Sequence, residues 1–233
     1  MDYTPLLDGM RDRGRQIGGL LHDARLVLCT ANRVALSVFV GGAQSSSRVV
    51  GAATTAAEGI GLVERLSPTL VVASDVLEQG DGISLVIDLK ARWPSLQTLL
   101  VVSREQRHQR IQAAIAAGCE GVLPESRLGQ GAALAALHAV SGGGIYVDRQ
   151  LRPAFRNVHR DCAPLETLTA RERDVLTLVA RGNSNSAIGQ ALHVSPDTVK
   201  THLRHVMRKL PARDRTHAAV LGLCWDLIEW PDP

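Results

Sequence analysis

Five short apolar runs alternate with helix-like stretches between about residues 25 and 142. Each run is almost continuously apolar, which is typical of strands buried on both faces of a parallel sheet. The runs are Leu26–Cys29, Arg48–Ala53, Leu70–Ala73, Thr98–Val102 and Gly121–Leu123, and helices are expected over 33–42, 55–66, 82–92, 105–117 and 130–141. Five strand–helix units in sequence predict an α/β fold, a doubly wound five-stranded parallel sheet with helices on both faces. The chemical or ligand site of such a sheet lies at the carboxyl ends of its strands.

The pattern changes on either side of this region. Residues 5–22 have apolar residues at helical spacing, and a run of glycines at 142–144 followed by Pro153 and Pro164 interrupts any long periodicity. After these prolines the pattern is wholly helical. We therefore expect an N-terminal helical extension over 1–23, the sheet domain over 24–142, a linker over 143–166 and an all-α domain over 167–233.

Composition excludes several classes of protein. Aromatic residues make up only 3% of the chain, which disfavours a reader of single strands that works by base stacking. The four cysteines match no metal-ligand spacing, and no phosphate-binding glycine loop or credible catalytic triad is present, so we expect no metal, no cofactor and no enzymatic activity. Neither a signal peptide nor a membrane-length apolar run is found, which predicts a soluble, cytoplasmic protein with reduced thiols.

The C-terminal region contains the parts of a helix-turn-helix in order. Thr169 and Glu172 form a capping-box pattern at the start of a helix that ends near Gly182. A short helix is expected from Asn185 to about Leu192, and a third begins at Ser195-Pro196, a capping residue followed by a proline at the first helical position. A helix, a short second helix, a tight turn and a reading helix are what this motif requires.

The third helix, expected from Pro196 to about Leu210, has two different faces. One face is an apolar stripe of Val199, Leu203, Val206 and Leu210, and the other is a basic stripe of Lys200, Arg204 and Arg208. Lysine and arginine on a helix in the major groove reach guanine N7 and O6 or bond to phosphates. The alternative is an ordinary amphipathic helix with a solvated basic face, and charge spacing alone does not separate the two.

The same residues resemble the DNA-binding domain of the LuxR/NarL family over about 168–222. The matching motifs are Leu168-Thr169-x-Arg171-Glu172-x-x-Val175-Leu176, Gly182-x-Ser184-Asn185-x-x-Ile188, Val194-Ser195-x-x-Thr198-Val199-Lys200-Thr201-His202, Lys209-Leu210 and Arg213-Asp214-Arg215. The resemblance implies a tetrahelical domain whose third helix enters the major groove and whose fourth helix pairs two protomers. Ser186-Ala187 and Pro211-Ala212 depart from the family pattern, but neither pair is on the reading face.

The resemblance also implies roles for individual residues. Lys200, Thr201 and Arg204 would reach bases or nearby phosphates. Ser195, Thr198, His202 and Arg208 would mainly position the DNA backbone, and His202 is equally well read as a packing residue.

Residues 25–142 resemble the receiver domain that commonly precedes this reader and accepts phosphate on an aspartate. Asp75, directly after the third apolar run, occupies the phosphoacceptor position, and Ser103 after the fourth run occupies that of the switching Ser or Thr. The loop from Gly80 to Gly82 is one residue shorter than the family pattern.

Two supporting elements of a receiver are missing. Cys29-Thr30 stands where receivers carry the acidic pair that binds Mg²⁺, and no Asp or Glu occurs from Ala24 to Ala57. Glu125 replaces the lysine that would pair with the acylphosphate, which reverses the charge at that position. We expect this domain not to use ordinary Mg²⁺-dependent phosphorylation. Asp75 is then a relic or bonds to a neighbouring backbone amide, and conventional phosphorylation at Asp75 is the alternative.

These features predict a sequence-specific transcription regulator that binds double-stranded DNA as a homodimer, with half-sites about one helical turn apart. RNA polymerase or a signalling protein is a possible further partner, and no membrane contact is expected. The alternative function is an adaptor that has lost DNA reading. Candidate dimer surfaces are the apolar helix Ala132–Val140 and the N-terminal helix, unless both simply pack within the chain.

Overall fold

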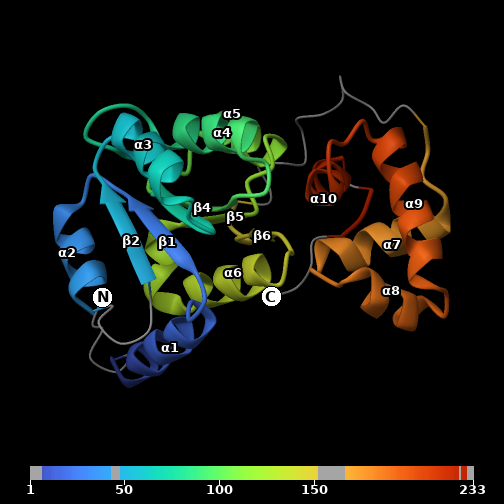
Figure 1. The fold of residues 1–233 in the computed structure, drawn as a ribbon, viewed down its shortest axis with the longest axis horizontal. Coiled ribbons are helices and arrows are strands. Elements are labelled where there is room, and N and C mark those ends of the chain that lie inside the picture. Colours follow the sequence, from blue (N-terminus) through green and yellow to red (C-terminus); the bar gives the residue numbers. More distant parts are fainter. Residues whose placement is uncertain (1–6, 43–47, 152–165, 226, 230–233) are drawn as a thin grey trace.

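The computed structural model describes residues 7–42, 48–151, 166–225 and 227–229. They form a sheet domain and a helical domain that lie side by side (Figure 1). The sheet domain contains the strands β1 Arg25–Cys29, β2 Arg48–Ala53, β3 Leu70–Ser74, β4 Gln97–Val102, β5 Gly121–Pro124 and β6 Tyr146–Val147. All pairings are parallel and the strand order is β2-β1-β3-β4-β5-β6.

The five predicted strands are present, and a sixth strand that the sequence analysis did not predict extends the sheet. β6 is only two residues long, and it lies inside the range predicted as linker. Backbone bonds from Tyr146 N to Glu120 O at 2.8 Å and from Asp148 N to Val122 O at 3.0 Å attach it to β5. Residues 145–148 and Leu151 are buried, so the sheet domain continues past residue 142.

Alternate residues of each strand face opposite sides of the sheet, and both sides are covered. On one side Val27, Val71 and Leu100 belong to a core shared with α3 Ala56–Leu66, α4 Gly82–Arg92 and α5 His108–Ala116. On the other side Leu26, Leu70 and Leu99 pack with α6 Ala132–Ser141. The continuous apolar runs are explained by this two-sided burial. Helices α3 to α5 lie above the sheet and α6 below it in Figure 1.

The two helices at the start of the chain differ in how they pack on the sheet domain. α1, Leu7–Leu20, packs on α6 through the partly buried Ile17 and Leu20, and Arg13 Nη2 donates to Gly129 O at 2.9 Å. α2, Arg33–Gly42, touches this core through Leu36. Both candidate dimer surfaces named above, the N-terminal helix and α6, therefore contact each other within one chain.

The helical domain is built from α7 Ala170–Ala180, α8 Asn185–Leu192, α9 Pro196–Lys209 and α10 Arg215–Cys224, with α7 packed on α8, α9 and α10. α10 also contacts α5 of the sheet domain, and its residues 218–224 are all buried. A backbone bond from Ile145 N to Ala180 O at 3.3 Å joins the domains. The fourth helix, expected to pair protomers, is thus buried within the chain.

Candidate DNA-binding interface and receiver site

The sequence signals for the helix-turn-helix correspond to specific contacts. Thr169 and Glu172 form the expected capping box, with Glu172 N donating to Thr169 Oγ1 and Thr169 N donating to Glu172 Oε2. Ser184 and Ser195 cap α8 and α9 by accepting from the backbone N–H of the third residue of each helix, Ala187 and Thr198. These caps fix where the helices begin and so the direction in which α9 points.

The turn between α8 and α9 depends on two local features. His193 ends α8 in the left-handed region, with φ +56°. Gly189 lies so close to the turn that a Cβ atom there would be 2.7 Å from Val194 O. A larger residue at position 189 would push the turn away from α8 and change the angle of α9.

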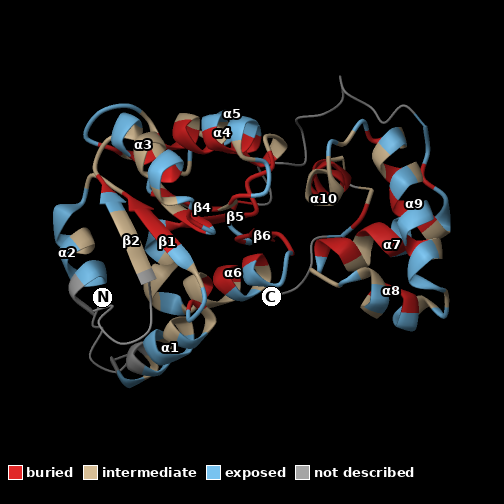
Figure 2. Ribbon diagram, viewed as in Figure 1, coloured by how far each residue is buried: buried red, intermediate tan, exposed pale blue. Residues whose placement is uncertain are grey.

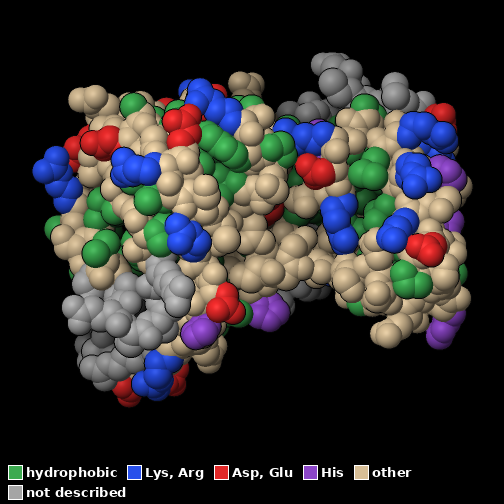
Figure 3. Space-filling model, in the orientation of Figure 1, with side chains coloured by type: hydrophobic (Ala, Val, Ile, Leu, Met, Phe, Trp, Pro, Cys, Tyr) green, Lys and Arg blue, Asp and Glu red, His purple; other side chains and the backbone are tan. Residues whose placement is uncertain are grey.

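α9 separates its two stripes as predicted. Val199, Leu203, Val206 and Leu210 are buried, whereas Lys200, Thr201, Arg204 and Arg208 are exposed. The alternation of buried and exposed residues along α9 is visible in Figure 2, and basic and histidine side chains gather over α9 at the right of Figure 3. The structure therefore brings the predicted base-reading residues together on one open face.

The remaining predicted residues lie at the edges of that face. Ser195 is exposed, and its hydroxyl forms a hydrogen bond of 2.9 Å with Thr198 Oγ1 as well as capping the helix. His202 is half-buried between the two stripes, consistent with either a packing or a positioning role. Lys200 Nζ lies 3.2 Å from Asp197 Oδ1, and both side chains are largely exposed, so this ion pair contributes little stability and leaves Lys200 accessible.

Other basic residues of the motif hold the domain together. Lys209 Nζ contacts Glu172 Oε2 at 2.8 Å and Thr167 O at 3.2 Å, which ties the end of α9 to the start of α7. Burial raises the pKa of Glu172, but the bonds from Lys209 and Thr169 lower it further, so its pKa lies below the usual value. Arg215 Nη2 donates to Asn183 O at 2.6 Å and connects α10 with the α7–α8 turn. We assign these residues to the scaffold.

The phosphoacceptor-like aspartate is buried and fully engaged. Asp75 follows β3 and is 2% exposed. Its Oδ1 accepts from Ser103 N at 2.8 Å and from Ser103 Oγ at 2.9 Å, and its Oδ2 accepts from Arg104 N at 3.2 Å. The expected bond to a neighbouring backbone amide is present, and the switch-like Ser103 is one of its donors.

The surroundings of Asp75 do not suit Mg²⁺. Cys29, where receivers have a carboxylate, is buried, and burial together with Glu58 raises the pKa of its thiol to about 12. Thr30 offers a hydroxyl in place of the second carboxylate. Magnesium prefers carboxylate and water oxygens, and both oxygens of Asp75 already accept protein hydrogen bonds. The residues present do not fit the ion.

Other carboxylates near the strand ends are also paired. Arg33 holds Glu78 in a two-pronged contact at 2.7 and 3.0 Å. Asp81 caps α4 and receives Arg107 and Arg110, each at 2.7 Å. Partial burial raises the pKa of Asp81, but the Ser84 amide and these arginines lower it further, so its pKa lies below the usual value.

The two arginines that pair with Asp81 were not predicted from the sequence. Neither Arg107 nor Arg110 belongs to a motif that marks it in the sequence. Their spacing of three within the helix expected over 105–117 was a signal that both side chains lie on the same side, although Arg107 is the N-cap of α5 in the structure. Glu125 is exposed at the start of the short 3-10 helix η3, Glu125–Gln130.

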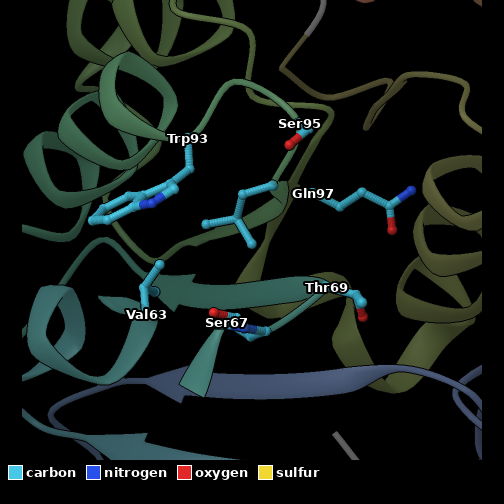
Figure 4. Close-up of a pocket in the computed structure, with 8 residues that line it drawn as sticks. Val63, Ser67, Thr69, Trp93, Ser95 and Gln97 are labelled. Carbon is cyan, nitrogen blue, oxygen red and sulfur yellow. The ribbon is translucent and has the colours of Figure 1, made fainter. Parts of the chain in front are cut away.

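A hollow of about 490 Å³ lies near the amino ends of β3 and β4. It is formed by Val63, the turn from Ser67 to Thr69, Trp93 and residues 95–97, and the Trp93 ring lies along one side of it (Figure 4). Asp75 and Ser103 follow the carboxyl ends of these same strands. The hollow is therefore separate from the receiver-like site.

No helix in the described part of the chain is long and apolar enough to cross a membrane. Among those same residues, no three His, Cys, Asp or Glu side chains gather in a way that would hold a metal ion.

Comparisons with known proteins agree with this architecture. Residues 166–221 match the model of the luxR family of bacterial regulatory proteins. The response regulator protein VraR of Staphylococcus aureus strain Mu3 is 27% identical over 197 residues, which cover 84% of this chain and 93% of that protein.

Two solved structures share the fold. The RcsB response regulator of Salmonella typhimurium covers 85% of this chain and 97% of its own, with a TM-score of 0.50 and 19% identity. A complex of the two-component response regulator RcsB with DNA covers 86% and 98%, with a TM-score of 0.51 and 18% identity. At these identities the likeness concerns the fold alone.

Proposed function

We propose that the chain is a sequence-specific transcription regulator that reads double-stranded DNA through α9, because residues 166–221 match the model of the luxR family of bacterial regulatory proteins. The observation that carries this proposal is the open face of Lys200, Thr201 and Arg204, backed by a fully buried apolar stripe. Such a helix fits the major groove, with its basic side chains directed at base edges and phosphates. The chain is then a DNA-binding protein. It acts in the cytoplasm, where the chromosome lies.

Within that face the residues have distinct tasks. Lys200 and Arg204 contact guanine edges or adjacent phosphates, and Thr201 lies beside them. Ser195, Thr198, His202 and Arg208 border this group on α9 and position the DNA backbone. Reading takes place as a homodimer on two half-sites about one helical turn apart.

The sheet domain acts without ordinary aspartyl phosphorylation in this account. Asp75 is supported as a structural residue by its three hydrogen bonds, and the position of the acidic pair is taken by Cys29 and Thr30. Two of these bonds hold Ser103 against the Asp75 carboxylate in the unmodified protein. The signal then comes from a partner protein, which includes RNA polymerase, from a small ligand, or from the amount of protein.

The proposal is tested by selecting duplexes from a random library with the full-length protein and then measuring affinity for the selected and a scrambled duplex. Replacing Lys200 and Arg204 together by alanine should remove about 1–3 kcal/mol or more of discrimination between the two. Arg173→Ala is the matched control, because Arg173 is an exposed arginine of α7 outside the reading face. An adaptor that has lost DNA reading would select no duplex.

A further inference from the structure

A second hollow, of about 750 Å³, lies where the sheet domain meets the helical domain. Residues of α1 and α6 line it together with Ile145 and Tyr146, and Ala180 and Arg181 at the end of α7 line it from the helical domain. α6 lies between α1 and α7 in Figure 1. The backbone bond from Ile145 N to Ala180 O joins the two domains beside it. We call this space the joint hollow, because both domains contribute to its lining.

The lining of the joint hollow is mainly apolar. Leu20 of α1, Leu134 and Ala139 of α6, and Ile145 all belong to it. Leu20 and Leu134 are only half-buried, so each leaves apolar surface uncovered. Small-molecule sites typically have volumes of about 300–1,000 Å³ and an apolar lining with a few polar groups that orient the ligand. The joint hollow has both properties.

The charge on the joint hollow is positive. Arg181 is exposed, and its guanidinium has neither an ion pair nor a hydrogen bond in the described part of the chain. His138, also exposed, lines the same space, and none of the described lining residues is acidic. A guanidinium binds a carboxylate through two parallel hydrogen bonds. The lining therefore complements a ligand that is apolar along its body and acidic at one end.

A glycine of α1 leaves room on one side of the joint hollow. A Cβ atom built at Gly19, which lines the hollow, meets no atom within 4 Å. A side chain at this position would therefore occupy space that a ligand could use. Gly14 of the same helix is equally open but does not line the hollow. The two positions allow a matched pair of variants.

We propose that the joint hollow binds a small amphipathic acid, a free monoacid whose apolar chain lies on Leu20 and Leu134 and whose acidic group pairs with Arg181. Its role as a signal rests on the proposed function, in which a small ligand is one of the inputs. The ligand touches α1 and α6 on one side and Arg181 on the other only while the domains are docked. Its binding therefore favours the docked arrangement.

Titration calorimetry of the full-length protein with octanoate, an aliphatic acid, and with 1-octanol, its uncharged counterpart, tests the site. The wild type should bind octanoate more tightly than 1-octanol. Arg181→Gln should weaken octanoate binding about tenfold and leave 1-octanol binding unchanged. Arg173→Gln is the control, because Arg173 is an exposed arginine of the same helix outside the hollow. No binding of octanoate, or equal binding of the two compounds to the wild type, would overturn the proposal.

A second pair of variants locates the binding. Gly19→Leu should abolish binding of both compounds by filling the hollow, whereas Gly14→Leu should leave it unchanged. Both variants should keep the thermal unfolding temperature of the wild type, since both positions are open. Val38→Ser removes an apolar side chain of α2 that is 67% exposed and should not affect binding. Loss of octanoate binding in Val38→Ser, or its retention in Gly19→Leu, would assign the site elsewhere and overturn the proposal.

Hydrogen exchange at the Ile145 amide measures the effect on domain docking. This amide donates to Ala180 O across the domain contact, so it exchanges when the contact opens. Octanoate should slow its exchange in the wild type and have no such effect in Arg181→Gln at the same concentration. Unchanged exchange in the wild type at saturating octanoate would contradict the link between the ligand and docking.

Failure of this inference is distinguishable from failure of the proposed function. The variant with alanine at Lys200 and Arg204 should lose discrimination between duplexes and bind octanoate as the wild type does. Arg181→Gln should keep that discrimination when octanoate is absent. A wild type that reads DNA but does not bind octanoate would overturn the joint hollow alone. A wild type that binds octanoate but selects no duplex would overturn DNA reading and, with it, the role of the ligand as a signal.

Discussion

The hydroxyl of Ser103 donates a hydrogen bond of 2.9 Å to Oδ1 of Asp75, and the Ser103 amide donates to the same oxygen at 2.8 Å. These contacts join the end of β3 to the end of β4. They make the phosphoacceptor-like aspartate a part of the fold.

Replacing Asp75 by alanine should therefore destabilise the protein. The substitution removes the acceptor for three donors, and we expect a loss of about 1–3 kcal/mol in the free energy of unfolding. Ser103→Ala removes one of the three bonds and should cost about 1 kcal/mol. Urea unfolding of both variants measures this difference. Equal stability of Asp75→Ala and the wild type would mean that these contacts contribute nothing.

Gly182→Ala should destabilise the protein more than Gly143→Ala, although the two glycines have similar φ angles. Gly182 has φ +83° and a Cβ there would lie 2.8 Å from Gly142 O, whereas Gly143 has φ +75° and open space around it. Gly143→Ala should cost about 1 kcal/mol through backbone strain alone. Gly182→Ala adds a clash across the domain contact, so it should be less stable and have a larger radius of gyration by small-angle scattering. Identical behaviour of the two variants would contradict the contact.

Domain docking should weaken as the solution becomes acidic. The His217 ring contacts the backbone of Ala116 in the sheet domain, and its Nδ1 accepts from Arg213 N at 3.2 Å. Burial lowers the pKa of His217 and Arg213 lowers it further, while Asp214 opposes the shift, and the net pKa lies below the ordinary value. The freed histidine thus binds a proton more readily than the docked one. The docked state is favoured above the ordinary histidine pKa of about 6.5 and loses stability as pH falls below it.

The check is the radius of gyration at pH 7.5 and at pH 5.5, compared with that of His217→Gln. The wild type should expand at the lower pH, and the variant, whose amide does not titrate, should change less. The same expansion in both proteins would assign the effect to other groups.

Arg204 and Arg208 should differ in what they contribute to DNA binding. Arg208→Ala removes a proposed phosphate contact, so it should weaken binding to the selected and the scrambled duplex alike. It should also reduce the slope of log K against log salt by about 0.9. Arg204→Ala should lower mainly the affinity for the selected duplex, by about 1–3 kcal/mol. Fluorescence anisotropy over a series of salt concentrations measures both effects. Equal loss of discrimination in the two variants would contradict this division of tasks.

Much of this architecture was readable from the sequence because two periodicities were clear. Strands buried on both faces are continuously apolar, and α9 repeats its apolar and basic residues every three or four positions. The predicted caps Thr169 and Ser195 then fixed the starts of α7 and α9, whereas the cap of α8, Ser184, was not identified beforehand.

The features that were not predicted depend on long-range contacts. β6 has two residues and exists through its bonds to β5, so no local pattern marks it. The burial of α10 comes from contacts with α5 and α7, which lie far from it in the sequence. The partners of Asp75 were foreseen only as a neighbouring amide, because the approach of Ser103 and Arg104 to it requires the parallel pairing of β3 and β4.

The proposed independence from aspartyl phosphorylation is tested most directly by the intact mass of the purified protein after incubation with Mg²⁺ and a small-molecule phosphodonor. Asp75→Asn and a receiver that labels normally are treated in parallel. The account predicts no phosphate adduct on this protein while the comparison receiver is labelled. An adduct on the wild type that is absent from Asp75→Asn would contradict the account and establish Asp75 as a phosphoacceptor.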